Sequence, residues 1–126
     1  MKNLVLIFII YLTQFINLSS NEPKLEEIIK GLNSPWSFSF MNSDHILVTE
    51  KSGNILKINL NNKKIDKISH NLNILEDGQG GLLEVLFHNK EIFVTYSENR
   101  GEGKSSTSVA KATLINNTLK FKNIFR

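Results

Sequence analysis

The feature that most constrains the fold is an alternation of apolar and polar side chains, with a period of two, that recurs along most of the chain. A period of two puts successive side chains on opposite faces, as in half-buried β-strands. The alternating segments form two groups of four, and the Val-Thr pair at 48–49 recurs at 94–95. No heptad or long helical period competes with this pattern. We therefore predict an all-β fold built from two similar four-stranded units.

The first unit begins after a proline at position 35. Its four predicted strands cover residues 35–40, 45–50, 56–60 and 63–68. In the first of them, Trp36, Phe38 and Phe40 alternate with serines. We expect Trp36 to be a core aromatic rather than a stacking platform for a ligand. Gly53 favours a tight hairpin turn at 51–54, because glycine accepts a positive φ.

The second unit repeats this arrangement with one longer loop. Its predicted strands cover residues 83–87, 92–97, 108–114 and 119–124. Two asparagines at 116–117 predict a turn, and a loop at 98–107 replaces the short turn of the first unit. The two units, about 34–70 and 80–126, have the size of propeller blades. The pattern alone leaves a small eight-stranded sandwich or barrel equally open.

The N-terminus has the features of a secretory leader. Lys2 precedes a nine-residue apolar run at 4–12, which is shorter than the roughly 20 residues that a membrane span needs. We expect residues 1–20 to be a signal peptide, the alternative being a retained anchor helix. The mature part, 21–126, would then be periplasmic or secreted. Residues 21–33 are compatible with either a short helix or an edge strand.

Composition excludes several classes of function. The chain has no cysteine, so disulfides, thiolate metal sites and a cysteine nucleophile are all ruled out. Fifteen basic against 12 acidic residues give a net charge of +3, which is too small to indicate nucleic-acid binding. We also expect no membrane association once the leader is removed.

The least common segment is the glycine-rich run at 76–83. Gly78, Gly80 and Gly81 enclose a single amide side chain, that of Gln79. Glycine has no Cβ, so a flat ligand or another strand can come close. The Gln79 amide offers two donors and an acceptor. The alternative is a tight crossover between the two units, in which Gln79 satisfies loop carbonyls.

A second segment, residues 100–105, ends like a phosphate-binding loop. The full motif needs a glycine where this chain has Glu98, and it must connect a strand to a helix. Here both neighbouring segments are predicted strands. We therefore expect a polar loop at one end of the second unit.

No catalytic or metal-binding residue is assigned. The three histidines, His45, His70 and His88, are scattered and have no second ligand at metal spacing. The carboxylates nearest the glycine-rich run match no calcium-binding loop, so solvated side chains are expected there. These carboxylates are Glu76, Asp77 and Glu84.

Taken in order, several of these segments resemble the N-terminal part of the soluble PQQ-dependent sugar dehydrogenases. This is the glucose/sorbosone dehydrogenase family, which includes the aldose sugar dehydrogenases. The resemblance covers roughly residues 30–126, and Gly-Gln-Gly-Gly-Leu-Leu at 78–83 is its most specific part. The other matching parts are the segments 34–40, 45–50, 53–55, 84–85 and 124–126, together with His88.

The resemblance implies a six-bladed β-propeller, with about two blades in this chain. It also implies pyrroloquinoline quinone (PQQ) at the mouth of the central channel and a Ca²⁺ ion that polarises it. In such enzymes a histidine takes the proton of a sugar's anomeric hydroxyl as hydride passes to the quinone. Gln79 matches the family's glutamine that contacts PQQ. The implied partners are an aldose and an electron acceptor.

The chain also departs from the family pattern. Asn89 stands where a proline usually follows the histidine of the second blade. The family's catalytic histidine and calcium ligands belong to later blades. The resemblance thus implies an N-terminal fragment of a periplasmic enzyme, inactive alone. The alternative from another class is a secreted, non-catalytic binding module that oligomerises to close a ring.

Overall fold

The structure is a computed structural model, and it describes residues 23–126. The predicted signal peptide lies outside the described residues. Nine strands form the regular structure of residues 23–126, which contain no helix and therefore none that could span a membrane. The all-β prediction is confirmed for this part of the chain.

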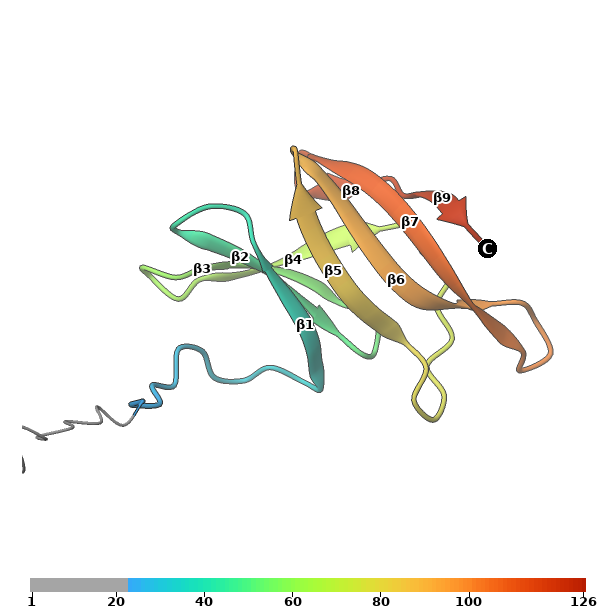
Figure 1. Cartoon of the computed structure of the whole chain (residues 1–126), viewed down its shortest axis with the longest axis horizontal. Coiled ribbons are helices and arrows are strands. Elements are labelled where there is room, and N and C mark those ends of the chain that lie inside the picture. The colour runs from blue at the N-terminus through green and yellow to red at the C-terminus, as the bar shows by residue number, and fades with distance from the viewer. Residues whose placement is uncertain (1–22) are drawn as a thin grey trace, which may run out of the picture.

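The strands form two antiparallel sheets joined by one short strand (Figure 1). The first sheet contains β1 (Pro35–Phe40), β2 (His45–Glu50), β3 (Ile55–Asn59) and β4 (Ile65–His70). The second contains β5 (Leu82–His88), β6 (Glu91–Asn99), β7 (Ser105–Ile115) and β9 (Lys122–Phe125). Between them, β8 (Thr118–Leu119) pairs in parallel with β4 and antiparallel with β7. A strand is present at each of the eight predicted positions.

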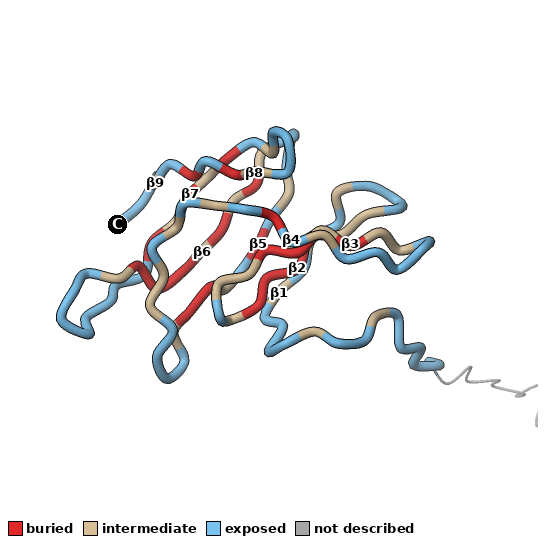
Figure 2. The backbone as a smooth tube through the Cα atoms, turned by 180° about the vertical axis from the view of Figure 1, so that it is seen from behind, coloured by how far each residue is buried: buried red, intermediate tan, exposed pale blue. Residues whose placement is uncertain are grey.

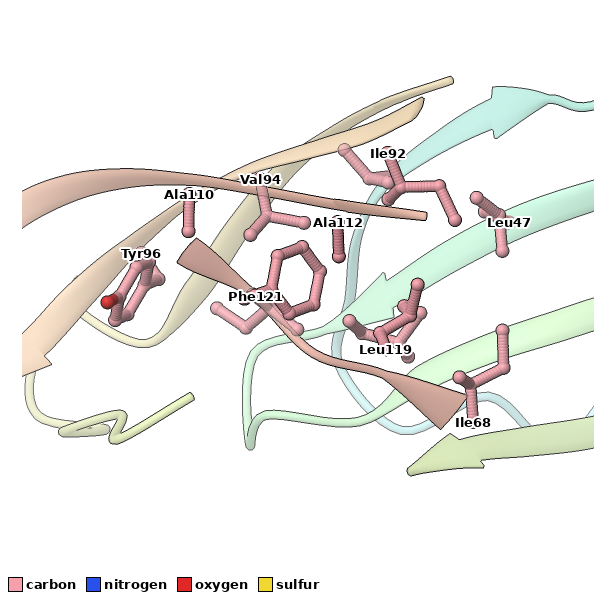
Figure 3. Packing of buried hydrophobic residues seen from close by; sticks show 12 residues of the cluster. Leu47, Ile68, Ile92, Val94, Tyr96, Ala110, Ala112, Leu119 and Phe121 are labelled. Atoms are coloured by element: carbon pink, nitrogen blue, oxygen red, sulfur yellow. The ribbon is translucent and has the colours of Figure 1, made fainter. Parts of the chain in front are cut away.

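The two sheets pack face to face, and the main core lies between them (Figures 2 and 3). The first sheet contributes Leu47, Ile55 and Ile68, each at most 1% exposed. Facing them are mostly aliphatic side chains of the second sheet and one tyrosine, and Leu119 and Phe121 belong to the same cluster. The second-sheet members are Leu82, Val85, Ile92, Val94, Tyr96, Ala110 and Ala112. Burial of this apolar surface is the main force that holds the sheets together.

Serine side chains connect the two sheets along the edge where β1 lies beside β5. The Phe87 N–H donates to the Ser39 hydroxyl at 2.9 Å, and the Ser37 hydroxyl donates to Glu84 at 2.8 Å. The buried Thr49 hydroxyl donates to the Leu83 carbonyl at 2.6 Å. Small hydroxyl side chains thus satisfy backbone groups that would otherwise be buried without a partner.

The expectation that Trp36 belongs to the core is wrong. Because the serine face of β1 is turned toward β5, its aromatic face points the other way. Trp36 is 42% exposed, and Phe38 and Phe40 are each 60% exposed. The alternation predicted the strand correctly, but the small polar residues of β1, not the large apolar ones, face the second sheet.

Residues 23–33 form neither the helix nor the strand that their sequence left open. Ile29 and Leu32 pack against Val48 and Ile58, on the face of the first sheet that is turned away from the second. Together with the β1 aromatics they line an apolar groove of about 490 Å³. The groove lies on the far side of the first sheet from the glycine-rich segment.

The predicted last strand, 119–124, is divided into β8 and β9. Phe121 lies between them and is 8% exposed. Its N–H donates to the Asn71 side chain at 2.7 Å, and its carbonyl accepts from the same amide at 3.2 Å. These two bonds replace ladder hydrogen bonds, and the inward turn of Phe121 ends the pairing at this point.

Candidate functional site

Three connections lie at one end of the molecule, which we call the crossover end (Figure 1, lower edge). They are the turn at 51–54, the segment 71–81 that crosses from β4 to β5, and the loop at 100–104. Strand direction alternates in both sheets, so these connections must emerge on the same side. Gln79 lies here, whereas His45 and His88 lie at the opposite ends of their strands.

Protein contacts explain two of the three glycines. A Cβ at Gly80 would lie 2.8 Å from the Ser97 hydroxyl. A Cβ at Gly81 would overlap the Lys51 carbonyl oxygen and lie 2.8 Å from the Lys51 Cγ. Gly81 therefore allows the start of β5 to lie directly against the first sheet. The tight crossover considered from the sequence is present.

The remaining glycine lies in open space. Gly78 has a φ of +52°, and a Cβ there would have no neighbour within 4 Å. Its role is to supply the left-handed conformation of the turn, which L-residues adopt at a cost. The space beside it is free for a ligand.

Gln79 is exposed at the tip of the crossover. Within residues 23–126 its side chain has no hydrogen-bond partner, so it does not satisfy loop carbonyls as the crossover alternative supposed. Its amide retains two donors and an acceptor for a ligand.

The base of the crossover is fixed to the second sheet. The Leu75 N–H donates to the Ser97 carbonyl at 2.9 Å, and the Asn99 N–H donates to Asn73 at the same distance. Below the tip, the Leu82 N–H donates to the Lys51 carbonyl at 3.0 Å. The exposed tip therefore rests on a well-bonded base.

His70 also lies at the crossover end, but both of its ring nitrogens are in use. Nδ1 accepts from the Leu72 N–H at 3.3 Å, so Nε2 carries the proton and donates to the Gly53 carbonyl at 2.7 Å. The ring packs edge-on against Phe121. His70 is thus a structural residue that ties the 51–54 turn to the crossover.

A buried carboxylate, missed by the sequence analysis, lies near this end. Glu98 is 8% exposed and accepts from the Ser108 hydroxyl at 2.6 Å and from the Asn123 amide at 3.1 Å. Arg100 and Arg126 approach its two oxygens at 3.1 and 3.0 Å. The Ser108 hydrogen bond and the two guanidinium groups lower the pKa of Glu98, against an opposing effect of burial.

Tyr96 extends this cluster. Its hydroxyl donates to the Asn123 side chain at 2.8 Å. Burial raises the pKa of the Tyr96 phenol, and the Glu98 charge acts in the same direction. The cluster joins β6, β7 and β9. The cluster could not be predicted from the sequence, because Glu98 and Arg126 are far apart in the chain and belong to no local motif.

No metal site is formed in the described part of the chain. Among residues 23–126, no three His, Asp or Glu side chains come together. Of the carboxylates near the glycine-rich run, Glu76 and Asp77 are exposed, and Glu84 accepts the hydrogen bond from Ser37. The loop at 100–104 connects two strands, as predicted, and not a strand and a helix.

Comparison with known proteins gives one consistent result. The sequence model described as glucose/sorbosone dehydrogenase matches residues 32–126. A crystal structure of a glucose dehydrogenase aligns with a TM-score of 0.76 and 30% identity over 82% of this chain. The apo-form soluble aldose sugar dehydrogenase from Escherichia coli aligns with a TM-score of 0.70 and 28% identity over 80% of this chain. None of the curated protein sequences is a significant match.

A more distant structure has the same fold. The PQQ-bound aldose sugar dehydrogenase from Streptomyces coelicolor aligns with a TM-score of 0.70 over 81% of this chain, at 17% identity. The chain spans about a third of each structure, namely 33%, 32% and 33% of their lengths. The prediction of a β-propeller with four-stranded antiparallel blades is confirmed, which decides between the architectures that the pattern left open.

Proposed function

The chain belongs to the glucose/sorbosone dehydrogenase family, and on that premise we propose that it supplies blades of a PQQ-dependent oxidoreductase acting on an aldose. The observation that carries this proposal is the crossover tip. It presents the amide of Gln79 to solvent beside the open space at Gly78. The partners would be the sugar and an electron acceptor.

The residues of this chain fit one contact to PQQ. PQQ, when bound, supplies the oxidant that accepts hydride from the sugar. The Gln79 side chain can donate to an oxygen of a planar quinone and accept from its ring N–H. The open space beside Gly78 allows a flat ring to approach the backbone. Residues 23–126 offer no comparable cluster of side chains for Ca²⁺.

The role of Gln79 predicts a loss of cofactor affinity. Replacing Gln79 with alanine removes every polar group of the tip side chain. The expected result is about tenfold weaker PQQ binding, as for one or two lost hydrogen bonds. Equilibrium dialysis of PQQ against the purified chain measures it. Asn61→Ala, in an exposed loop at the opposite end, is the control. Equal affinities for Gln79→Ala and the unaltered chain would refute the contact.

We propose further that this chain does not oxidise a sugar by itself. A general base must reach the hydroxyl proton that it abstracts. Both nitrogens of His70 are hydrogen-bonded, and His45 and His88 lie at the end away from Gln79. We expect no glucose oxidation above background from the purified chain with PQQ, Ca²⁺ and an artificial electron acceptor. Robust turnover would contradict this proposal and favour a base among these histidines.

We also propose that the chain acts in the periplasm or outside the cell. The support is the sequence pattern at the N-terminus, with Lys2 followed by the apolar run at 4–12. N-terminal sequencing of the exported protein checks this proposal, because a mature start near residue 21 is required by it.

A further inference from the structure

We propose that Lys51 is the positioning residue of the crossover tip: its ammonium group holds the Gly78 carbonyl and thereby fixes the direction of the neighbouring Gln79 side chain. The Lys51 Nζ donates to the Gly78 carbonyl oxygen at 2.5 Å. Lys51 lies in the turn between β2 and β3, whereas Gly78 lies in the crossover from β4 to β5, so this bond ties the crossover to the first sheet. The effect of Lys51 on PQQ binding rests on the proposed function, whereas its effect on the orientation of the tip does not.

The turn that carries Lys51 is held by several hydrogen bonds. The Glu50 carboxylate, 5% exposed, accepts from the Asn54 amide at 2.7 Å and from the Asn33 N–H at 2.6 Å. The Gly53 N–H donates to the Glu50 carbonyl, and the Gly53 carbonyl accepts from His70. A side chain that extends from this turn therefore starts from a fixed base.

The backbone of Lys51 is hydrogen-bonded to both sheets. Its N–H donates to the Ser34 carbonyl at 3.0 Å, and its carbonyl accepts from the Leu82 N–H at 3.0 Å. Gly81 packs directly against the same carbonyl. Lys51 thus contacts the start of β1 and the start of β5 through its backbone, and only its side chain reaches the tip.

The tip has few other constraints. Within residues 23–126, the Lys51 ammonium makes the one hydrogen bond that connects residues 76–79 to anything outside the crossover. The other bond at the tip is internal, from the Gly80 N–H to the Asp77 carbonyl at 2.6 Å. Without the ammonium group, the turn would open more often, and the tip would lose its fixed orientation relative to the first sheet.

The test compares three variants of the full chain. Lys51→Met keeps the length and the backbone contacts but removes the charge and the donors. Lys51→Arg keeps a positive donor and should rescue the effect. Lys67→Met, an exposed β4 lysine whose side chain has no partner within residues 23–126, is the matched control. Because the Lys51 ammonium is outside the core, all three should fold, and slow exchange of the Leu47 amide checks this.

The first readout needs no cofactor. We expect the Gly80 amide of Lys51→Met to exchange with solvent about tenfold faster, as for the loss of one partly screened, charge-assisted hydrogen bond. Lys51→Arg and Lys67→Met should match the unaltered chain. Unchanged exchange in Lys51→Met would overturn the inference, whatever the cofactor does.

The second readout is the dissociation constant for PQQ. Lys51→Met should bind PQQ about tenfold more weakly, with affinity restored in Lys51→Arg, since a disordered Gln79 must be ordered on binding. Undiminished affinity in Lys51→Met would also overturn the positioning role. If the unaltered chain binds no PQQ while Gly80 exchange is accelerated in Lys51→Met, the hold on the tip stands and the proposed Gln79–PQQ contact fails.

Discussion

Replacing Gly81 with alanine should destabilise the fold by about 3 kcal/mol, the largest effect that we expect from a single methyl group in this chain. The added Cβ would overlap the Lys51 carbonyl oxygen, which is backbone and cannot rotate away. Gly81 also has a φ of +151°, a conformation that an L-residue rarely adopts. To relieve the overlap, β5 would have to move away from the first sheet and open the core. Urea unfolding monitored by circular dichroism measures the loss of unfolding free energy.

The matched control is Gly101→Ala. Gly101 has a φ of +83°, but a Cβ there would have no neighbour within 4 Å. The backbone cost alone, about 1 kcal/mol, should appear at this position. If the free energy of unfolding falls clearly more in Gly81→Ala than in Gly101→Ala, the difference is due to the contact with Lys51. Similar losses at the two sites would mean that the sheets are not in close contact at this point.

The positions of the strands could be predicted because each strand has its own local pattern. β2 shows this well. Its six residues include a β-branched run, and the Gly53 turn that follows marks where the strand ends. The turn at Asn116 and Asn117 is equally local, and both residues have the positive φ that such a hairpin turn requires. Signals of this kind depend on neighbours in sequence and need no knowledge of the other sheet.

The faces of β1 could not be predicted in the same way. Alternation shows that Trp36 and Ser37 point to opposite sides, but not which side meets the second sheet. The answer depends on β5, whose N–H groups require the serine hydroxyls. The interruption at Phe121 has the same origin, because its partner, Asn71, is distant in the sequence.

The candidate site also combines features that are local in sequence with contacts between distant residues. The cluster of glycines around Gln79 was visible in the sequence, because three glycines in four positions are rare by chance. The contacts that hold this segment were not visible. Lys51 and Glu98 are ordinary charged residues in the sequence, and only the fold brings one to Gly78 and the other to Arg126.

Replacing Glu98 with glutamine should lower the free energy of unfolding by about 2 kcal/mol at pH 7. Glutamine keeps the shape of the side chain but turns an amide NH₂ toward the donors that surround the carboxylate. Arg100 and Arg126 would lose their counter-charge, and the Ser108 hydroxyl would lose a charged acceptor. Because the cluster joins β6, β7 and β9, the loss should appear as earlier unfolding of the whole second sheet in urea.

The pH dependence of this loss identifies its cause. The pKa of Glu98 is lower in the folded chain than in the unfolded one, so its stabilisation is complete above the unfolded value, about 4.3. That stabilisation disappears as the pH falls through the lower folded pKa, and the difference between the unaltered chain and Glu98→Gln should shrink there.

Glu91→Gln is the control for the Glu98 measurement, because Glu91 pairs with Lys111 at 2.8 Å on a surface where both side chains are about 40% exposed. Such a pair contributes at most about 1 kcal/mol. If Glu98→Gln cost no more than Glu91→Gln at pH 7, the Glu98 cluster would be merely a surface network. A difference that persists undiminished at low pH would instead point to altered packing, because protonation removes the charge of Glu98 but leaves its shape.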